Sequence, residues 1–231
     1  MHVLAIDTSV SAVGAAIADE QGLIGQLELA QGRQASETLL PLTKSLLDLS
    51  KLRLSDMDVL AVTSGPGSFT GLRIGLATVK AWAQALAKPV VAVSTLQALA
   101  YSACERGRLI CPIINARRGE LYAALFAQGE RLLEDMLITP QALAERLAAY
   151  SGPVIFCGDG LAEAGEKLTA LLGKRMLQAP KQRQCFLAGA AALIGCDKYR
   201  QKDLADPITL APAYLRLAAA QENIGEVKQY G

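Results

Sequence analysis

The chain contains the same strand and helix pattern twice, and this duplication constrains its fold more than any other feature. Each half opens with a short apolar strand that ends in isoleucine, and the next residue is Asp7 in one half and Asn115 in the other. The glycines of the following turns, Gly22 and Gly129, lie 15 and 14 residues further on. A near-constant offset of this kind indicates an internal duplication.

Strands alternate with helices in both halves, which argues for an α/β sheet protein. The predicted strands are Val3–Ile6, Val13–Ala18, Leu23–Leu29, Val59–Thr63, Val90–Val93, Leu109–Ile114, Glu120–Ala127, Arg131–Ile138 and Val154–Cys157. The predicted helices begin after a cap at Ser36, at Leu72, after a cap at Ser94, and at Pro140, Leu161 and Gln184. We place the boundary between two lobes so that they span residues 1–107 and 108–231. A duplicated unit of this order resembles the actin-like ATPase fold, which is ribonuclease H-like and binds ligand between its lobes.

A glycine-rich segment, Ser64–Gly75, follows one predicted strand and precedes a long helix. Glycine lets the backbone approach a ligand closely, and the N–H groups at a helix N-terminus attract anions. The segment lacks the Gly-Lys-Ser/Thr ending of a P-loop and the G-x-G-x-x-G spacing of a dinucleotide loop. It is therefore either an unusual phosphate loop or a tight structural turn that starts a partner-facing helix.

Composition and charge exclude several classes of function. Hydrophobic residues make up 52% of the chain and the net charge is +1, so we expect a buried core and no surface that holds nucleic acid unaided. The only histidine is His2, which excludes an internal Ser-His-Asp triad, a Cys-His pair and an H-E-x-x-H zinc site. Arg117 and Arg118 lie in a predicted loop, where they either meet RNA or phosphate or form a solvated turn.

The five cysteines show no C-x-x-C spacing and are odd in number, which favours buried, reduced thiols in a cytoplasmic protein. We expect no signal peptide before the first strand, because polar residues follow that strand almost at once. No apolar run reaches about 18 residues, so we expect no membrane-spanning helix.

Asp7, with Thr8 and Ser9, is the best candidate for binding phosphate or Mg²⁺, by analogy with the first-strand acid of the actin-like fold. The alternative is a carboxylate that caps the turn after the first strand. Gly158-Asp159-Gly160 also lies between a strand and a helix, and it fits either a nucleotide contact or an ordinary turn with an N-cap. Ser68 does not match G-x-S-x-G and has no internal base to activate it, so we do not assign it as a nucleophile.

The predicted helix over residues 72–87 is apolar on nearly every side, which indicates deep burial or a second packing partner. One apolar stripe contains Leu72, Leu76, Val79, Ala83 and Leu86, and a second contains Ile74, Ala77, Ala81 and Ala85.

Five segments together resemble the TsaB (YeaZ) family, which acts in the biosynthesis of threonylcarbamoyladenosine in tRNA. They are Val3-Leu-Ala-Ile-Asp-Thr-Ser9, Ser64-Gly-Pro-Gly-Ser-Phe-Thr-Gly-Leu-Arg-Ile-Gly75, Val91-Ala-Val-Ser-Thr-Leu96, Ile114-Asn-Ala-Arg-Arg-Gly-Glu-Leu-Tyr122 and Pro212-Ala-Tyr-Leu-Arg216. The resemblance covers roughly residues 1–216. It implies a non-catalytic paralogue of TsaD, the enzyme that installs threonylcarbamoyl on the adenosine beside the anticodon in tRNAs reading codons that begin with A.

The resemblance also implies partners. TsaD would form a heterodimer with this chain, TsaE would supply ATPase activity, and the chain alone would form a homodimer. tRNA would be met only through the complex; no cofactor is required, although ATP or ADP would fit at the partner interface. The family dimerises through two helices, so the implied interface residues are Leu39, Leu42, Leu46, Leu72, Ile74, Gly75, Thr78, Val79 and Trp82.

The chain departs from the catalytic paralogue at the metal site. TsaD carries H-x-x-x-H after the strand equivalent to Val90–Val93, and the corresponding residues here are Thr95 and Leu99, neither of which replaces imidazole as a ligand. Asn115 stands where related sequences show Asp, which weakens a second metal-binding carboxylate. Two rival functions remain at this point: a stand-alone ATPase or small-molecule kinase of the actin-like fold, and a metallopeptidase, which the missing histidines disfavour.

Overall fold

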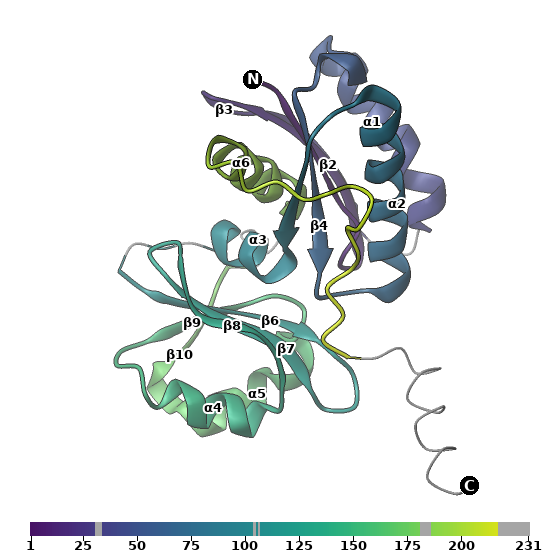
Figure 1. The fold of residues 1–231 in the computed structure, drawn as a ribbon. Helices are drawn as coiled ribbons and strands as arrows, with labels where there is room; N and C mark the ends of the chain where they lie inside the picture. The colour runs from purple at the N-terminus through teal and green to yellow at the C-terminus, as the bar shows by residue number, and fades with distance from the viewer. Residues whose placement is uncertain (31–33, 104, 106, 181–185, 217–231) are drawn as a thin grey trace, which may run out of the picture.

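The computed structural model describes residues 1–30, 34–103, 105, 107–180 and 186–216, and these form two lobes, each built on a five-stranded mixed sheet (Figure 1). The first sheet has the order β3-β2-β1-β4-β5 and contains β1 (Val3–Asp7), β2 (Ala12–Asp19), β3 (Gly22–Ala30), β4 (Val59–Gly65) and β5 (Val90–Ser94). The second has the order β10-β9-β6-β7-β8 and contains β6 (Leu109–Asn115), β7 (Leu121–Ala127), β8 (Glu130–Ile138), β9 (Val154–Cys157) and β10 (Met176–Gln178).

The described helices follow the same order in each half. The first half contains α1 (Ala35–Ser50), α2 (Phe69–Leu86) and α3 (Thr95–Ser102), and the second contains α4 (Pro140–Leu147), α5 (Leu161–Leu172) and α6 (Leu187–Arg200). Short 3₁₀ turns, η1 (Leu54–Asp56) and η2 (Gly173–Arg175), precede β4 and β10.

The two sheets share one topology. β1 pairs antiparallel with β2 and parallel with β4, and β6 pairs antiparallel with β7 and parallel with β9. The predicted duplicated α/β architecture is therefore confirmed. β10 was not predicted, because it has only three residues and two of them are exposed, so no apolar alternation marks it.

Caps decide where the helices begin. The predicted cap at Ser94 is confirmed, since its Oγ accepts a hydrogen bond from the Gln97 N–H at 3.2 Å. The predicted cap at Ser36 is wrong, because α1 starts at Ala35 after Gln34. α2 begins three residues before the predicted Leu72, since Ser68 caps it. The predicted start at Gln184 lies outside the described residues, and α6 is described from Leu187.

Helices cover both faces of the first sheet. α1 and α2 pack on one face, and α6 packs on the other against β1, β2 and β4 (Figure 1). A Cβ on Gly14 would lie 3.1 Å from the Ala188 Cβ, and one on Gly195 would lie 3.0 Å from the Ala61 Cβ, so α6 lies close to the sheet. The division at residues 107 and 108 stays a prediction, but α6, which follows that division in the chain, packs on the first lobe's sheet.

The lobes are joined through a shared apolar core. Residues of α3 and α6 lie in one buried cluster with residues of both sheets, including Ala61, Val93, Ile114 and Phe126. Within the described part of the chain, no helix is both long and apolar enough to cross a lipid bilayer.

The segment after α6, residues 203–216, is referred to below as the C-terminal strap. It runs along the first lobe beside α2 and reaches the second lobe (Figure 1). The Ala205 N–H donates to the Val90 carbonyl at 2.8 Å, and the Ala213 N–H donates to the Ser64 carbonyl at 2.7 Å. Arg216 then donates to the Ala116 carbonyl at 2.7 Å. The strap therefore ties the two lobes together.

Candidate functional site

The turn after β1 carries the predicted phosphate or magnesium residues, and the structure buries all three of them. The Asp7 Oδ1 accepts hydrogen bonds from the Ser9 N–H at 3.1 Å, the Ser9 Oγ at 2.5 Å and the Thr63 Oγ1 at 2.6 Å. The Thr8 Oγ1 donates to the Gly71 carbonyl at 2.7 Å. Burial raises the pKa of Asp7, and the hydrogen bonds from Ser9 and Thr63 offset part of that rise.

The glycine-rich segment packs against this same turn. A Cβ on Gly67 would lie 2.2 Å from the Ser9 carbonyl oxygen, and a Cβ on Gly71 would lie 2.0 Å from the Thr8 carbonyl oxygen. The Ser68 N–H donates to the Ser9 carbonyl at 2.7 Å. These glycines are required for contact between two parts of the backbone, so the structure supports the tight structural turn over the phosphate loop.

Two further glycines of the segment complete this packing. A Cβ on Gly75 would lie 2.4 Å from the Thr8 Oγ1. Gly65 has φ +122, and a Cβ there would lie 2.9 Å from the Ala213 carbonyl oxygen. Ser68 itself caps α2, since its Oγ accepts the Gly71 N–H at 3.2 Å. All four glycines thus contact protein atoms rather than open space.

Glu28 was missed by the sequence reasoning, and it is the ionisable group beside Asp7. In the sheet register Asp7 pairs with Gly14 and Gly14 pairs with Glu28. Burial, followed by the charge of Asp7, raises the pKa of Glu28 from 4.5 to about 7, although a hydrogen bond from the Phe186 N–H lowers it. The sequence did carry one signal for this residue, a glutamate between Leu27 and Leu29 in a predicted strand. Its position beside Asp7, however, depends on the strand register, which the sequence pattern does not give.

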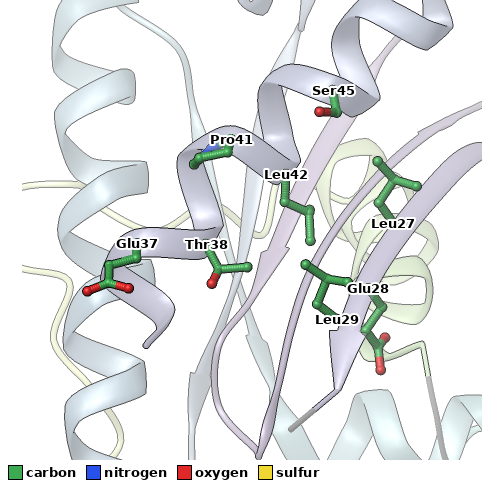
Figure 2. Close-up of a pocket in the computed structure, with 8 residues that line it drawn as sticks. All are labelled: Leu27, Glu28, Leu29, Glu37, Thr38, Pro41, Leu42 and Ser45. Atoms are coloured by element: carbon green, nitrogen blue, oxygen red, sulfur yellow. The ribbon is translucent and has the colours of Figure 1, made fainter. Parts of the chain in front are cut away.

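Glu28 also lies at the edge of a groove of about 500 Å³ between β3 and α1. Leu27, Leu29 and Leu42 form its apolar wall, whereas the Glu28 carboxylate points away from α1 (Figure 2). The groove therefore offers an apolar surface without a set of convergent polar groups.

In the second lobe, Asn115 occupies the position of Asp7 and is held by neighbours from the turn after β9 and from α5. Its N–H donates to the Asp159 Oδ1 at 3.0 Å, and its side-chain amide donates to Glu163. A Cβ on Gly158 would lie 2.2 Å from the Ile113 carbonyl oxygen, so Gly158-Asp159-Gly160 forms a closely packed turn. This is the ordinary turn with an N-cap that the sequence offered as an alternative, since Gly160 is the N-cap of α5, without a side-chain hydrogen bond.

Thr95 and Leu99, the residues expected in place of the paralogue's two histidines, lie on α3 in the shared core. Both side chains are buried, and the Thr95 Oγ1 has no hydrogen-bond partner among the described residues. Across the described ranges, no group of three or more His, Cys, Asp or Glu side chains is arranged to hold a metal ion.

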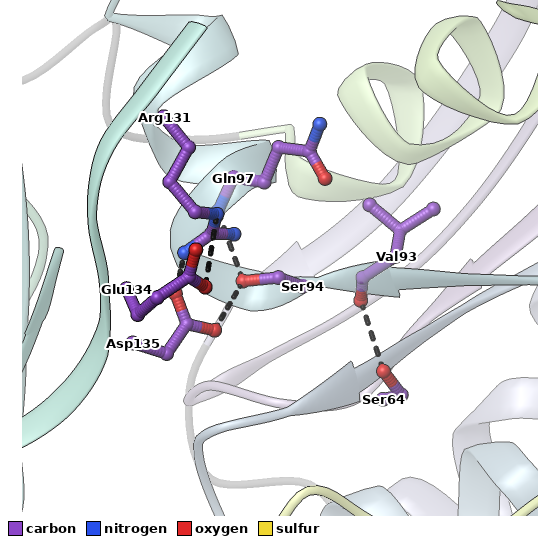
Figure 3. Close-up of polar contacts among 7 residues, drawn as sticks. All are labelled: Ser64, Val93, Ser94, Gln97, Arg131, Glu134 and Asp135. Atoms are coloured by element: carbon purple, nitrogen blue, oxygen red, sulfur yellow. Dashed lines mark hydrogen bonds and ion pairs between the residues drawn. The ribbon is translucent and has the colours of Figure 1, made fainter. Parts of the chain in front are cut away.

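A polar cluster joins α3 to the second lobe beside this core (Figure 3). The Ser94 Oγ donates to the Asp135 Oδ2 at 2.7 Å, and Asp135 pairs with Arg131 on the same strand, β8. The guanidinium carbon of Arg131 also lies 4.7 Å from the centre of the Phe126 ring. These contacts cross the lobe junction and fix α3 against β8.

The nine predicted interface residues separate into two groups. Six of them are buried in the chain itself: Leu39, Leu42, Leu46, Leu72, Gly75 and Val79. The other three, Ile74, Thr78 and Trp82, are partly exposed and therefore accessible to another chain. For all nine residues the partner interface stays a prediction.

The second apolar stripe of α2 does lie on the surface. Ala77, Ala81 and Ala85 are exposed and Ile74 is partly exposed. On the neighbouring α1, Leu40 is 54% and Leu49 is 75% exposed. An apolar helix face of this kind is typical of a protein interaction surface.

The cysteines are buried where the structure describes them. Burial raises the pKa of Cys157 to about 12 and that of Cys111 well above its ordinary value. These thiols remain protonated near neutral pH and are poor nucleophiles. Cys104 and Cys185 lie outside the described residues.

Comparison with solved structures defines the class of protein. YeaZ from Pseudomonas aeruginosa is 29% identical and superposes with a TM-score of 0.74, covering 93% of this chain and 99% of that one. A polyphosphate/ATP-glucomannokinase from Arthrobacter superposes with a TM-score of 0.56 at 13% identity, covering 86% and 99%, which shows the fold alone. The chain is thus a two-lobed protein of the actin-like fold.

The sequence comparisons give the family. The model of the TsaD family, tRNA N6-adenosine threonylcarbamoyltransferase, matches residues 26–224. The tRNA threonylcarbamoyladenosine biosynthesis protein TsaB of Bacillus subtilis is 32% identical over 225 residues, which is 96% of each chain. The chain belongs to the TsaD family and, within it, to the TsaB (YeaZ) group, as the sequence motifs predicted.

Proposed function

We propose that this protein is a non-catalytic subunit of the complex that installs threonylcarbamoyl on the adenosine beside the anticodon in tRNA. The observation that supports this proposal is that the side chains of both candidate centres, the Asp7 turn and the Thr95 and Leu99 positions, are already bonded or buried within the chain. Asp7, Thr8 and Ser9 are occupied by hydrogen bonds within the chain, and Thr95 and Leu99 are buried in the core. Neither centre presents a free nucleophile, base or metal ligand to a substrate.

In this proposal TsaD is the catalytic partner and binds the exposed apolar face of α2, with α1 beside it. Ile74, Ala77 and Ala81 give this face small and apolar side chains, which allow a helix from another chain to approach closely. A second copy of the chain fits the same face, so the protein alone forms a homodimer in competition with TsaD.

ATP or ADP, if it binds, lies between this chain and its partner rather than within the chain. The Asp7 turn does not fit a nucleotide on its own, because its hydroxyls and glycines are already in contact with protein atoms. TsaE, as the ATPase component, joins the TsaD complex, and the assembly operates in the cytoplasm.

The test is reconstitution of threonylcarbamoyl transfer to an unmodified tRNA that reads codons beginning with A. We expect no modified nucleoside from this chain alone and product when TsaD, TsaE and the activated threonylcarbamoyl donor are added. Robust modification by the purified chain alone would contradict the proposal. ATP turnover by the chain alone would favour the rival interpretation, a stand-alone ATPase or kinase.

A further inference from the structure

Two exposed aromatic rings are held together where α2 begins. Phe69 is 37% and Tyr214 is 39% exposed, and their ring centres lie 5.0 Å apart with an interplanar angle of 27°. The Arg73 guanidinium carbon lies 3.9 Å from the centre of the Phe69 ring, and the Arg73 Nε donates to the Tyr214 Oη at 3.0 Å. The three side chains form a fixed aromatic and cationic surface.

The C-terminal strap fixes Tyr214 from both directions. Before it, the Lys80 ammonium donates to the carbonyls of Ile208 at 3.1 Å and Leu210 at 2.9 Å, and Ala213 is bonded to Ser64. After it, Arg216 is bonded to the second lobe. Tyr214 is therefore ordered before any ligand arrives, which lowers the entropic cost of binding.

Arg216 also links the strap that holds Tyr214 to a loop with two further arginines. It donates to the Ala116 carbonyl and pairs with Glu120, the residues on either side of the loop that carries Arg117 and Arg118. Both loop arginines are exposed, and both have a left-handed backbone conformation, with φ +64 for Arg117 and +55 for Arg118. Asn or Gly adopts this conformation at lower cost, so folding alone does not favour arginine at these positions.

Two of the charges near this surface, those of Arg73 and Arg117, are available to a ligand. Neither Arg73 nor Arg117 forms an ion pair with a carboxylate in the described part of the chain. Glu120, the nearest acid of the loop, is paired with Arg216. Arginines beside stacked aromatic rings are the combination that recognises unstacked bases and their phosphates.

We propose that Phe69, Arg73, Tyr214, Arg117 and Arg118 form a contact surface for single-stranded RNA. This inference rests on the proposed function, under which the RNA is the anticodon region of tRNA held in the TsaD complex. The chain's net charge of +1 is too small to bind RNA by itself, so the surface supplements the grip of the partner.

The aromatic stack has an alternative role, which is to anchor the strap to α2. Changing the loop charges alone tests RNA binding without disturbing that anchor. Arg117→Asn combined with Arg118→Asn removes two charges, and Asn accepts the left-handed backbone. The matched control is Lys51→Asn combined with Lys202→Asn. Both lysines are exposed and have a left-handed backbone conformation, with φ +55 for Lys51 and +59 for Lys202. Each double variant is assembled with TsaD, and binding of an unmodified tRNA transcript is measured over a range of salt concentrations.

We expect the arginine variant to bind about tenfold more weakly near 0.1 M salt, with a salt slope lower by about one to two, and the lysine control to bind as wild type. Tyr214→Leu keeps an apolar side chain against Phe69 but removes the stacking face, so we expect a loss of about fivefold or more. Tyr214→Phe keeps the ring and should retain most of the affinity.

Sedimentation of each complex gives the readout that separates RNA binding from assembly. Equal tRNA affinity in the wild-type, arginine-variant and Tyr214→Leu complexes overturns the RNA surface but leaves the proposed function intact. Loss of TsaD or TsaE from the variant complexes identifies a protein-docking surface instead and also overturns it. A wild-type chain that adds nothing to TsaD activity overturns the proposed function itself.

Discussion

Ala81→Asp is the most direct test of the partner surface on α2. Ala81 is exposed at the middle of the apolar stripe that Ile74 and Ala77 continue. In the free chain the substitution costs only the lower helix propensity of aspartate, about 0.7 kcal/mol. In an assembled interface the same carboxylate loses water without gaining a partner, which costs several kcal/mol. A cost of about 3 kcal/mol weakens association by more than 100-fold.

The assay compares thermal unfolding with sedimentation on one sample, first for the chain alone and then with TsaD. We expect a folded monomer that does not bind TsaD, with a melting temperature close to that of wild type. Ile74→Asp should weaken association equally but also lower the melting temperature, because Ile74 packs partly against the core.

The matched control is Ala170→Asp, an exposed alanine on α5 in the other lobe. An aspartate near the end of a helix is also opposed by the helix dipole, so the folding cost of this control is at least as large. If Ala81→Asp dimerises and binds TsaD as the control does, the face of α2 is not the interface. If Ala81→Asp unfolds the chain, the exposure on which the prediction depends is incorrect.

Two further perturbations test the Asp7 turn. Gly71→Ala places a Cβ 2.0 Å from the Thr8 carbonyl oxygen, so we expect urea unfolding to show a stability lower by about 2–3 kcal/mol. The control is Gly165→Ala, whose Cβ has no neighbour closer than 3.7 Å and which should be neutral or slightly stabilising. Equal effects of the two substitutions would contradict the packing argument. Glu28→Gln should remove a pH dependence: the folded state binds a proton between pH 4.5 and about 7 that the unfolded state does not, so wild-type stability falls as pH rises through this window. Because Glu28 is partly exposed, we expect the variant to be more stable than wild type by only about 1 kcal/mol at pH 8 and not at pH 4.5, and parallel melting profiles for the two proteins would refute the assignment.

The duplicated fold was predictable because its signals are local. Each strand is a short apolar run and each helix a periodic one, and the glycines of the hairpin turns repeat at a near-constant offset. Helix ends were less predictable where several residues compete as caps. Ser36 and Gln34 lie two positions apart, and the residue type favoured Ser36 while the structure uses Gln34.

The candidate site was harder to predict because its contacts are not local. Glycines at residues 65–75 have the same sequence signature whether they approach a phosphate or another backbone, and the partner here, Thr8, lies about sixty residues away along the chain. Glu28 faces Asp7 only because two strand pairings place both beside Gly14. The apolar residues of α2 were identified, but the register that turns Val79 inward and Ala81 outward is a tertiary property.

The arrangement of α2 links the features discussed above. Gly75 contacts Thr8 in the buried turn, while Ile74, the preceding residue, lies at the outer face. At the start of the same helix, Phe69 and Arg73 hold the strap that joins the lobes. The helix has 18 residues and is about 27 Å long, so one element connects the buried turn, the strap and the outer face. Under the proposed function, a partner that displaced α2 from its outer face would also displace the Asp7 turn and the strap. Partner binding would in this way be coupled to the positions of both.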